Sequence, residues 1–269
     1  MAKIIAITNQ KGGVGKTTTC VNLAASLAAT KRRVLLVDMD PQGNATMGAG
    51  IDKYDLEYSA NEVLMNEIDI EQVIVSSERA GFDVLPANGD LTAAEVNLLH
   101  ELSREARLQK ALMRVKDRYD YVLIDCPPSL NMLTLNALTA AGSVIIPMQC
   151  EYYALEGLAA LLDTIAQVRD AVNPDLEVEG LLRTMFDTRN KLSSEVVKQL
   201  REHFGDKVFR TAIPRNIKLA EAPSHGLPAL LYDRSSRGAQ SYLALAGELV
   251  GRSVIGNANR VESLEGLDG

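Results

Sequence analysis

Lys11-Gly12-Gly13-Val14-Gly15-Lys16-Thr17-Thr18 is the stretch that decides the fold of this chain of 269 residues. An apolar segment rich in β-branched residues, 3–8, precedes it and predicts a buried parallel strand. Apolar residues recur at helical spacing through 19–29, directly after it. A strand, a glycine-rich loop and a helix in this order are the setting that a phosphate-binding loop requires. The stretch therefore predicts a nucleotide site.

The residues of this loop suit a phosphate group. Glycines let the backbone approach phosphate oxygens closely, and the start of the following helix adds partial positive charge. Lys16 is placed to reach the β- and γ-phosphates, and the Thr17 hydroxyl is placed to hold Mg²⁺. The predicted nucleotide-binding residues of the loop are Lys11, Gly12, Gly13, Val14, Gly15, Lys16, Thr17 and Thr18.

The loop departs from the usual phosphate-binding pattern at its start. That pattern opens with a glycine at the position of Gln10, and a second lysine, Lys11, stands beside it. A chance run of glycines is the alternative, and the strand and helix that flank the loop argue against it. A dinucleotide-binding fingerprint is excluded, because it requires a glycine where Thr18 stands.

The chain as a whole has the length and composition of an α/β protein. Its length fits one domain or at most two, and 46% hydrophobic residues are enough for a full core. Predicted strands alternate with predicted helices, which indicates one doubly wound, mainly parallel sheet flanked by helices. We expect one domain over 1–250 and a flexible tail over 251–269. The predicted strands are 3–8, 33–38, 82–86, 121–125, 143–148, 176–184 and 211–213, and the predicted helices are 19–29, 61–65, 70–75, 104–115, 158–168, 193–204 and 238–250.

Acidic residues follow two of the predicted strands. Asp38 and Asp40 stand at the end of 33–38, and Asp125 ends 121–125. Sheets of this class place ligand groups at the carboxyl ends of strands, and an Asp downstream of a phosphate loop holds Mg²⁺ directly or through water. A turn is the alternative for Asp38 and Asp40, because Asp, Pro and Gly also form turns. Their position at the end of a strand favours a ligand site.

Composition argues against several other kinds of site. The three cysteines, Cys20, Cys126 and Cys150, lack metal-site spacing, and no signal peptide precedes the first strand, so we expect reduced cytosolic thiols. No apolar stretch approaches the length of a membrane span. Trp is absent and aromatic residues make up 4%, so the stacking of nucleic-acid bases on aromatic side chains is not indicated.

With these residues in view, the chain resembles the ParA/Soj chromosome-partitioning ATPases, in the deviant Walker A group that also holds the MinD division-site ATPases. The resemblance extends from Lys3 to about Val250, and Gln10 is characteristic of the group. The motifs that carry it are Lys11-Gly12-Gly13-Val14-Gly15-Lys16-Thr17-Thr18, Asp38-Met39-Asp40-Pro41-Gln42-Gly43-Asn44, Asp125-Cys126-Pro127-Pro128-Ser129, Cys150-Glu151-Tyr152-Tyr153-Ala154-Leu155-Glu156-Gly157 and Ile213-Pro214-Arg215-Asn216.

The resemblance implies a P-loop NTPase fold and slow, partner-stimulated hydrolysis of ATP. Two ATP-bound subunits of such proteins close face to face, which assigns Lys11 to the partner's phosphates. A second cation there suits a transition state that spreads charge over its oxygens. Asp40 would orient or activate the attacking water, and Lys16 completes the implied catalytic set.

The same resemblance implies the cofactors, ATP and Mg²⁺, and where they are held. Thr17 and, through water, Asp125 would hold the metal ion. The adenine would lie near Pro214 and Asn216, an assignment that rests on the resemblance alone.

Charge is distributed unevenly along the chain, whose net charge is −7. Residues 183–237 hold 11 basic and 6 acidic side chains, so this segment is +5 and the remainder is −12. A local basic field can attract DNA even in an acidic protein. The residues alone leave a DNA surface and an ordinary solvated helix face equally open. The resemblance implies sequence-independent binding of double-stranded DNA, for which the candidates are Arg189, Arg215 and Lys218.

The resemblance also implies an ATP-dependent homodimer, a ParB-like centromere-binding partner, and a cytoplasmic, nucleoid-associated location. Because the chain starts at its first strand, we expect no N-terminal DNA-reading extension. A MinD-like ATPase that cycles on a membrane, or another cargo-positioning ATPase, is the alternative. The sequence 259–268 is short and acidic, which argues against membrane anchoring. Asp40 argues against a non-catalytic scaffold, and the unpaired cysteines argue against an iron–sulfur ATPase.

Overall fold

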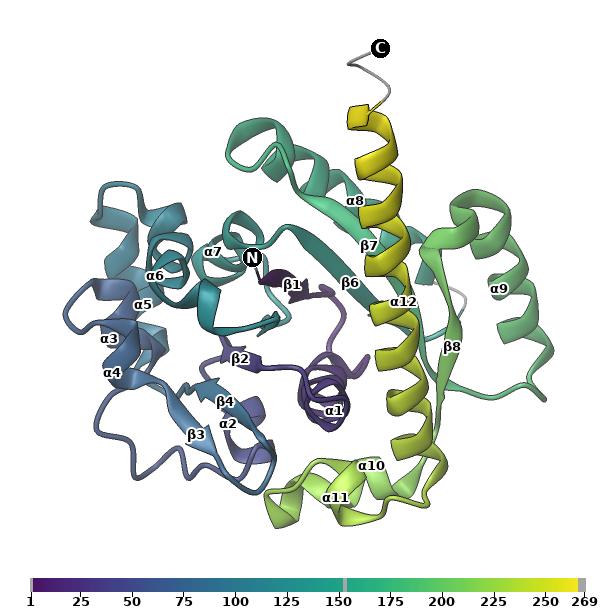
Figure 1. Cartoon of the computed structure of the whole chain (residues 1–269), viewed down its shortest axis with the longest axis horizontal. Coiled ribbons are helices and arrows are strands. Elements are labelled where there is room, and N and C mark those ends of the chain that lie inside the picture. Colours follow the sequence, from purple (N-terminus) through teal and green to yellow (C-terminus); the bar gives the residue numbers. More distant parts are fainter. Residues whose placement is uncertain (1, 152–153, 266–269) are drawn as a thin grey trace.

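A single mixed sheet forms the centre of the molecule (Figure 1). The structure is a computed structural model that describes residues 2–151 and 154–265, with side chains as far as residue 253. Within this part of the chain the sheet has eight strands in the order β3-β4-β2-β5-β1-β6-β7-β8. Every neighbouring pair is parallel except β3 and β4.

The strands are β1 (Lys3–Ile7), β2 (Val34–Asp38), β3 (Val75–Ser77), β4 (Phe82–Leu85), β5 (Tyr121–Asp125), β6 (Ser143–Met148), β7 (Glu177–Phe186) and β8 (Val208–Pro214). The α-helices are α1 (Lys16–Ala29), α2 (Asn44–Gly48), α3 (Ala60–Met65), α4 (Ile70–Val73), α5 (Leu91–Asn97), α6 (Arg107–Val115), α7 (Met132–Ala140), α8 (Ala154–Ala171), α9 (Lys191–Phe204), α10 (Ile217–Glu221), α11 (Ala229–Tyr232) and α12 (Arg237–Glu265).

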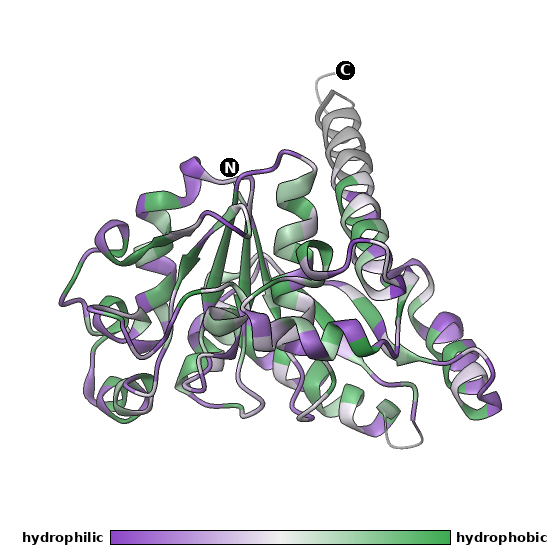
Figure 2. Ribbon diagram, turned by 90° about the horizontal axis from the view of Figure 1, so that it is seen from below, coloured by the Kyte–Doolittle hydropathy of each residue, from purple (hydrophilic) through white to green (hydrophobic). Residues whose placement is uncertain are grey.

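Two hydrophobic cores cover the two faces of this sheet. Alternate residues of a strand point to opposite faces, so Ile5 and Ile7 of β1 join one core and Ala6 joins the other. Helices α1 and α12 pack on the Ile5 face, and α3 to α9 contribute to the other core. Figure 2 shows mostly hydrophobic strands between helices in which hydrophobic and hydrophilic residues are mixed. This double burial explains why the central strands are apolar without interruption.

The register of the strands brings the ligand-bearing ends together. Asp125, the last residue of β5, pairs with Ile7 of β1 on one side and with Asp38 of β2 on the other. The loop that follows β1 is the glycine-rich stretch 8–15. Parallel strands therefore place this loop and two carboxylates at one edge of the sheet, where such folds bind ligands.

The doubly wound, mainly parallel sheet is confirmed. The predicted helix 70–75 ends at Val73, and Val75 starts an antiparallel edge strand. Helix α7 was not predicted, because its nine residues are almost all buried and leave no amphipathic period.

The predicted C-terminal tail overlaps a helix. Helix α12 continues to Glu265, so an end near residue 250 was too early. Residues 266–269 lie outside the described part of the chain, and the division into one domain and a flexible tail stays a prediction. Among the described residues, no helix combines the length and the apolar character needed to cross a bilayer.

Candidate functional site

Two glycines with left-handed backbone conformations shape the phosphate loop. Gly13 has φ 73° and Gly15 has φ 88°, a region in which a side chain would be strained. Gly15 is also the residue from which α1 starts, so the loop leads directly into the helix N-terminus. Lys16 is 7% exposed, and its Nζ donates a hydrogen bond to the Lys11 carbonyl at 3.4 Å. The loop thus folds around its own lysine, as a phosphate site requires.

Polar side chains from two other strands fix this loop. The Thr184 hydroxyl of β7 donates to the Val14 carbonyl at 2.8 Å, and Gln149, just after β6, donates to the Gly13 carbonyl at 3.2 Å. Sequence reasoning missed Thr184 and Gln149. Their place near the carboxyl ends of predicted strands was the available signal, because all such ends converge on one edge.

Thr17 and Asp125 meet directly, as the prediction of a shared metal site requires. The Thr17 hydroxyl donates to Asp125 Oδ2 at 2.7 Å. Asp125 is fully buried, and its Oδ1 has no hydrogen-bond partner within the described residues. A buried, unpartnered carboxylate oxygen is costly unless a cation or a proton meets it. The pair therefore fits a hard cation such as Mg²⁺, with nucleotide phosphates and water as its other ligands.

The charged side chains at this edge of the sheet shift one another's pKa values. Burial raises the pKa of Asp125 well above its usual range, and the negative charge of Asp38 acts in the same direction. Burial lowers the pKa of Lys16, while the carboxylates of Asp125 and Asp40 oppose that change. The described residues hold no cluster of three or more His, Cys, Asp or Glu side chains arranged for a metal. A cation here would depend on the ligand's own oxygens.

Asp38 and Asp40 have different surroundings although they are two residues apart. Asp38 is fully buried, and its Oδ2 accepts hydrogen bonds from both the amide and the hydroxyl of Thr46, each at 2.8 Å. Its burial raises the pKa of Asp38 to about 6 against the opposing effect of these bonds. Asp40 is half-buried, and its Oδ1 accepts from the Gln42 amide at 3.0 Å. Asp38 thus anchors the loop, and Asp40 is the more exposed of the two carboxylates.

Lys11 is exposed and paired within its own chain. Its Nζ lies 2.6 Å from Glu151 Oε2, and its amide donates to Asn9 Oδ1 at 2.9 Å. Sequence reasoning quoted Glu151 within a motif but gave it no role. The Lys11 ammonium group is therefore held by Glu151 rather than lying free in solvent.

The predicted base-binding residues, Pro214 and Asn216, lie at the end of β8 and the start of α10. Asn216 Oδ1 accepts the Lys218 amide at 3.1 Å and so caps α10. The segment that follows is tied to the helix of the phosphate loop, because the Ala229 amide donates to Asn22 Oδ1 at 2.7 Å. Within the described residues, no hydrogen bond joins Asn216 to the phosphate loop.

The predicted DNA-binding residues lie on the surface but differ in their partners. Arg189 is 89% exposed in its side chain and pairs with Asp187 at 2.7 Å. Lys218 pairs with Glu221 at 2.9 Å, and Arg215 is exposed without an ion pair among the described residues. Arg183, one of the basic residues counted from the sequence, is buried and donates to the carbonyls of Phe209 and Arg210 at 3.0 and 2.8 Å. Its burial leaves it unable to contact DNA directly.

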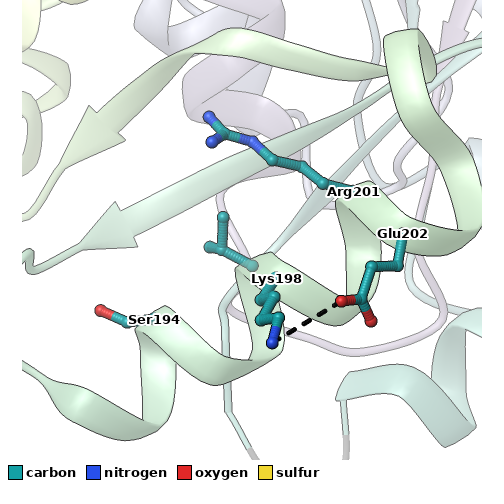
Figure 3. Close-up of a pocket in the computed structure, with 5 residues that line it drawn as sticks. Ser194, Lys198, Arg201 and Glu202 are labelled. Atoms are coloured by element: carbon teal, nitrogen blue, oxygen red, sulfur yellow. Dashed lines mark ion pairs between the residues drawn. The ribbon is translucent and has the colours of Figure 1, made fainter.

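A shallow hollow of about 360 Å³ lies on α9, away from the phosphate loop. Its lining residues are Ser194, Val197, Lys198, Arg201 and Glu202. Figure 3 shows Lys198 and Glu202 reaching toward one another, with 3.8 Å between their charged atoms, while Arg201 points elsewhere. One helix supplies all of the lining, so this hollow is not the nucleotide site, and Glu202 offsets the charge of Lys198.

Comparison with known proteins agrees with this geometry. A family model described as an AAA domain matches residues 2–178. The sporulation initiation inhibitor protein Soj of Bacillus subtilis is 56% identical over 249 residues, which is 93% of this chain and 98% of that protein. The chromosome partitioning protein ParA of Myxococcus xanthus is 53% identical over 252 residues, or 94% of this chain and 89% of that protein. A solved structure of cobyrinic acid a,c-diamide synthase from Mycobacterium smegmatis, with bound ATP analog and magnesium, has a TM-score of 0.81 at 40% identity and covers 93% of this chain and 95% of its own.

Proposed function

The chain belongs to the AAA-domain family and, within it, to the ParA/Soj chromosome-partitioning proteins, and on this premise we propose that it is a DNA-segregation ATPase. ATP closes a homodimer that binds double-stranded DNA without sequence choice, and hydrolysis reopens it. The observation that carries the proposal is the buried Thr17–Asp125 pair beside Lys16, at the edge of the sheet where the phosphate loop lies. ATP and Mg²⁺ are the nucleotide and the metal ion of this site, as in the related solved structure.

The residues of the loop bind the phosphates. Lys16 carries a positive charge into a poorly solvated site, where its attraction for phosphate oxygens is stronger than in water. Thr17 and Asp125 would hold Mg²⁺, which supplies charge neutralisation of the phosphate oxygens. The unpartnered Asp125 Oδ1 supports this assignment, because a cation or its water would satisfy that oxygen.

Asp40 prepares the water that attacks the γ-phosphate. One of its carboxylate oxygens accepts the Gln42 amide, and no hydrogen bond to the other is found in the described chain. That oxygen is free to accept a hydrogen bond from a water molecule and to hold the water in line with the γ-phosphate. Phosphoryl transfer to water needs no covalent enzyme intermediate, so catalysis at this site depends on the position of the attacking water.

Lys11 completes the site of the partner subunit in the dimer. Its charge would stabilise the transition state in the manner of an arginine finger. The Lys11–Glu151 pair supports slow basal turnover, because this pair must be exchanged before Lys11 can cross an interface. A ParB-like partner that favours the exchange would stimulate hydrolysis and release DNA. DNA binding by the ATP dimer would associate the protein with the nucleoid.

DNA binding by a slowly hydrolysing variant tests this proposal. Asp40→Ala would be mixed with arbitrary double-stranded DNA in the presence of ATP, ADP or no nucleotide, across a salt series. We expect tight binding with ATP only, independent of sequence, with a log–log salt slope of about −0.9 per phosphate contact. Glu71→Ala, which removes an exposed acid on α4, is the control for a general change of charge and should behave as the unaltered protein.

A dimer that forms with ATP yet fails to bind DNA at low salt would leave the nucleotide site intact and remove the DNA function. Flotation of the same dimer with anionic liposomes would then test the membrane alternative. Equal DNA binding with ADP and ATP would overturn the nucleotide switch.

A further inference from the structure

Thr46 lies between two loops at the nucleotide edge of the sheet. This α2 residue is fully buried. Its hydroxyl donates to Asp38 Oδ2 at 2.8 Å and accepts the Ala87 amide at 2.9 Å. Its own amide donates to the same Asp38 oxygen at 2.8 Å. One side chain thus joins the end of β2 to the segment that follows β4.

The other oxygen of Asp38 continues this chain of hydrogen bonds to Asp40. Asp38 Oδ1 accepts the Asp40 amide at 3.2 Å. The links therefore run from Ala87 through Thr46 and Asp38 to the backbone of the residue that prepares the attacking water. Bonds in a buried network strengthen one another, and each loss leaves a polar group unsatisfied.

The loop also lies tightly against the Ala87 segment. Gly43 has φ 59°, and a Cβ at this position would lie 2.5 Å from the Ala87 carbonyl oxygen. The backbone of the Asp40 loop therefore has little room to shift toward β4. The Thr46 hydroxyl limits movement in the other direction, because it holds Asp38 at the end of β2.

Capping of helix α2 does not explain the hydrogen bonds of the Thr46 hydroxyl. The helix has five residues, and its N-cap, Gly43, makes no side-chain capping bond. The partners of the Thr46 hydroxyl are 8 residues earlier and 41 residues later in the chain. Its bonds therefore connect separate loops rather than satisfy a helix end.

We propose that Thr46 is a positioning residue for ATP hydrolysis, whose hydroxyl fixes Asp38 and through it the Asp40 loop. The inference rests on the proposed ATPase function. A catalytic group that is displaced by about 1 Å can lose about 100-fold in rate. No hydrogen bond joins Thr46 to the phosphate loop among the described residues, so nucleotide binding should not depend on its hydroxyl.

Thr46→Val and Thr46→Ser separate the hydroxyl from the shape of the side chain. Valine keeps the branched shape but leaves the Ala87 amide and Asp38 short of one bond each, whereas serine retains the hydroxyl. We expect kcat of Thr46→Val to fall about 10- to 100-fold with KM for ATP changed less than about twofold. Thr46→Ser should stay within about threefold of the unaltered protein in both constants.

Tyr119→Phe is the matched control. It removes another buried hydroxyl–carboxylate bond, from Tyr119 to Asp83 Oδ2 at 2.8 Å, near the amino ends of the strands. Both variants should unfold at a lower temperature, but only Thr46→Val should lose kcat. Unchanged kcat in Thr46→Val, equal losses in the two variants, or no rescue by serine would overturn the inference.

Two further results have a defined meaning. If Thr46→Val does not fold, Thr46→Ala takes its place against Thr46→Ser, and the same difference in kcat is required. If the unaltered protein does not hydrolyse ATP, the proposed function itself fails, and a loss confined to Thr46→Val cannot be confused with that result.

Discussion

Lys11 Nζ and Glu151 Oε2 lie 2.6 Å apart, so the lysine that the dimer would need is held within its own subunit. The two side chains are 52% and 54% exposed. Exposed ion pairs of this kind contribute little to stability, about 0–1 kcal/mol. The pair therefore favours this position of Lys11 only weakly, and it can be exchanged for a nucleotide phosphate at little cost.

Glu151→Gln should favour the ATP dimer. Loss of the competing carboxylate frees Lys11 in both subunits, and at up to about 1 kcal/mol for each pair we expect dimers to form at protein concentrations up to about 30-fold lower. Sedimentation velocity in ATP, over a series of protein concentrations, measures the shift. Glu156→Gln changes an exposed acid of α8 and should leave the dimer unchanged. Weaker dimerisation of Glu151→Gln would mean that Glu151 assists the interface.

Lys11→Ala should lose both ATP-driven dimerisation and hydrolysis while still binding nucleotide. Lys16 and Thr17 remain to bind the phosphates within the subunit, whereas the partner's phosphates lose their cation. Binding of a fluorescent ATP analogue and sedimentation in ATP give the two readings. Lys110→Ala, on the exposed face of α6, is the control. Normal dimerisation and hydrolysis in Lys11→Ala would rule out a role across the interface.

Arg189→Glu should abolish DNA binding but leave ATP-dependent dimerisation intact. Arg189 is almost fully exposed beyond its pairing with Asp187, and reversal of its charge repels phosphates on both subunits of a dimer. Filter binding at low salt measures the loss. Arg169→Glu is a close control, because Arg169 is also exposed and lies beside an acid, Asp170, outside the basic segment. Undiminished retention of DNA by Arg189→Glu would refute the assignment.

The stability of the nucleotide-free protein should fall as the pH rises from about 4 to 7. Burial raises the pKa of Asp38 from 3.8 to about 6 and raises that of Asp125 as well. Below pH 6 these two side chains therefore bind more protons in the folded protein than in the unfolded chain, and their contribution to the free energy of unfolding decreases as these protons leave. The decrease is about 3 kcal/mol for Asp38 alone.

Urea unfolding in EDTA at several pH values measures this effect, and Asp38→Asn is its control. The variant cannot titrate at that position, so its free energy of unfolding should fall less steeply over the same interval. Added Mg²⁺ and ADP should also flatten the curve, because a cation favours the ionised form of Asp125. Parallel curves for Asp38→Asn and the unaltered protein would contradict the assignment.

The parts of the fold that were predictable from sequence are those that depend on short patterns of neighbouring residues. The strand before the phosphate loop, its glycines and the acids Asp38 and Asp125 are local patterns, and the parallel sheet brings them together without further information. The meeting of Thr17 and Asp125 was predictable from the phosphate-loop motif and from the Asp at the end of a downstream strand, and their role in holding a metal ion stays a prediction. Catalytic and base-binding roles rest on the family resemblance and stay predictions.

The residues that were missed act through distant contacts. Thr184 meets Val14 across 170 positions, and Glu151 meets Lys11 across 140. Strand-end position indicates only that Thr184 lies at the ligand edge of the sheet, and neither Thr184 nor Glu151 carries a local pattern that names its distant partner. Strand β3 was missed for a related reason, because three residues at a sheet edge are too few to show a period of two.

The hydrogen bond between Thr19 of α1 and Tyr242 of α12, at 3.1 Å, affects the order in which the protein matures on the ribosome. Helix α1 carries the phosphate loop near the start of the chain, yet Tyr242, Leu245 and Leu249 complete the core that covers it. These residues emerge last during translation. The helix of the phosphate loop therefore reaches its final packing only when the chain is nearly finished, and a chain that ends before α12 lacks part of the core that covers α1.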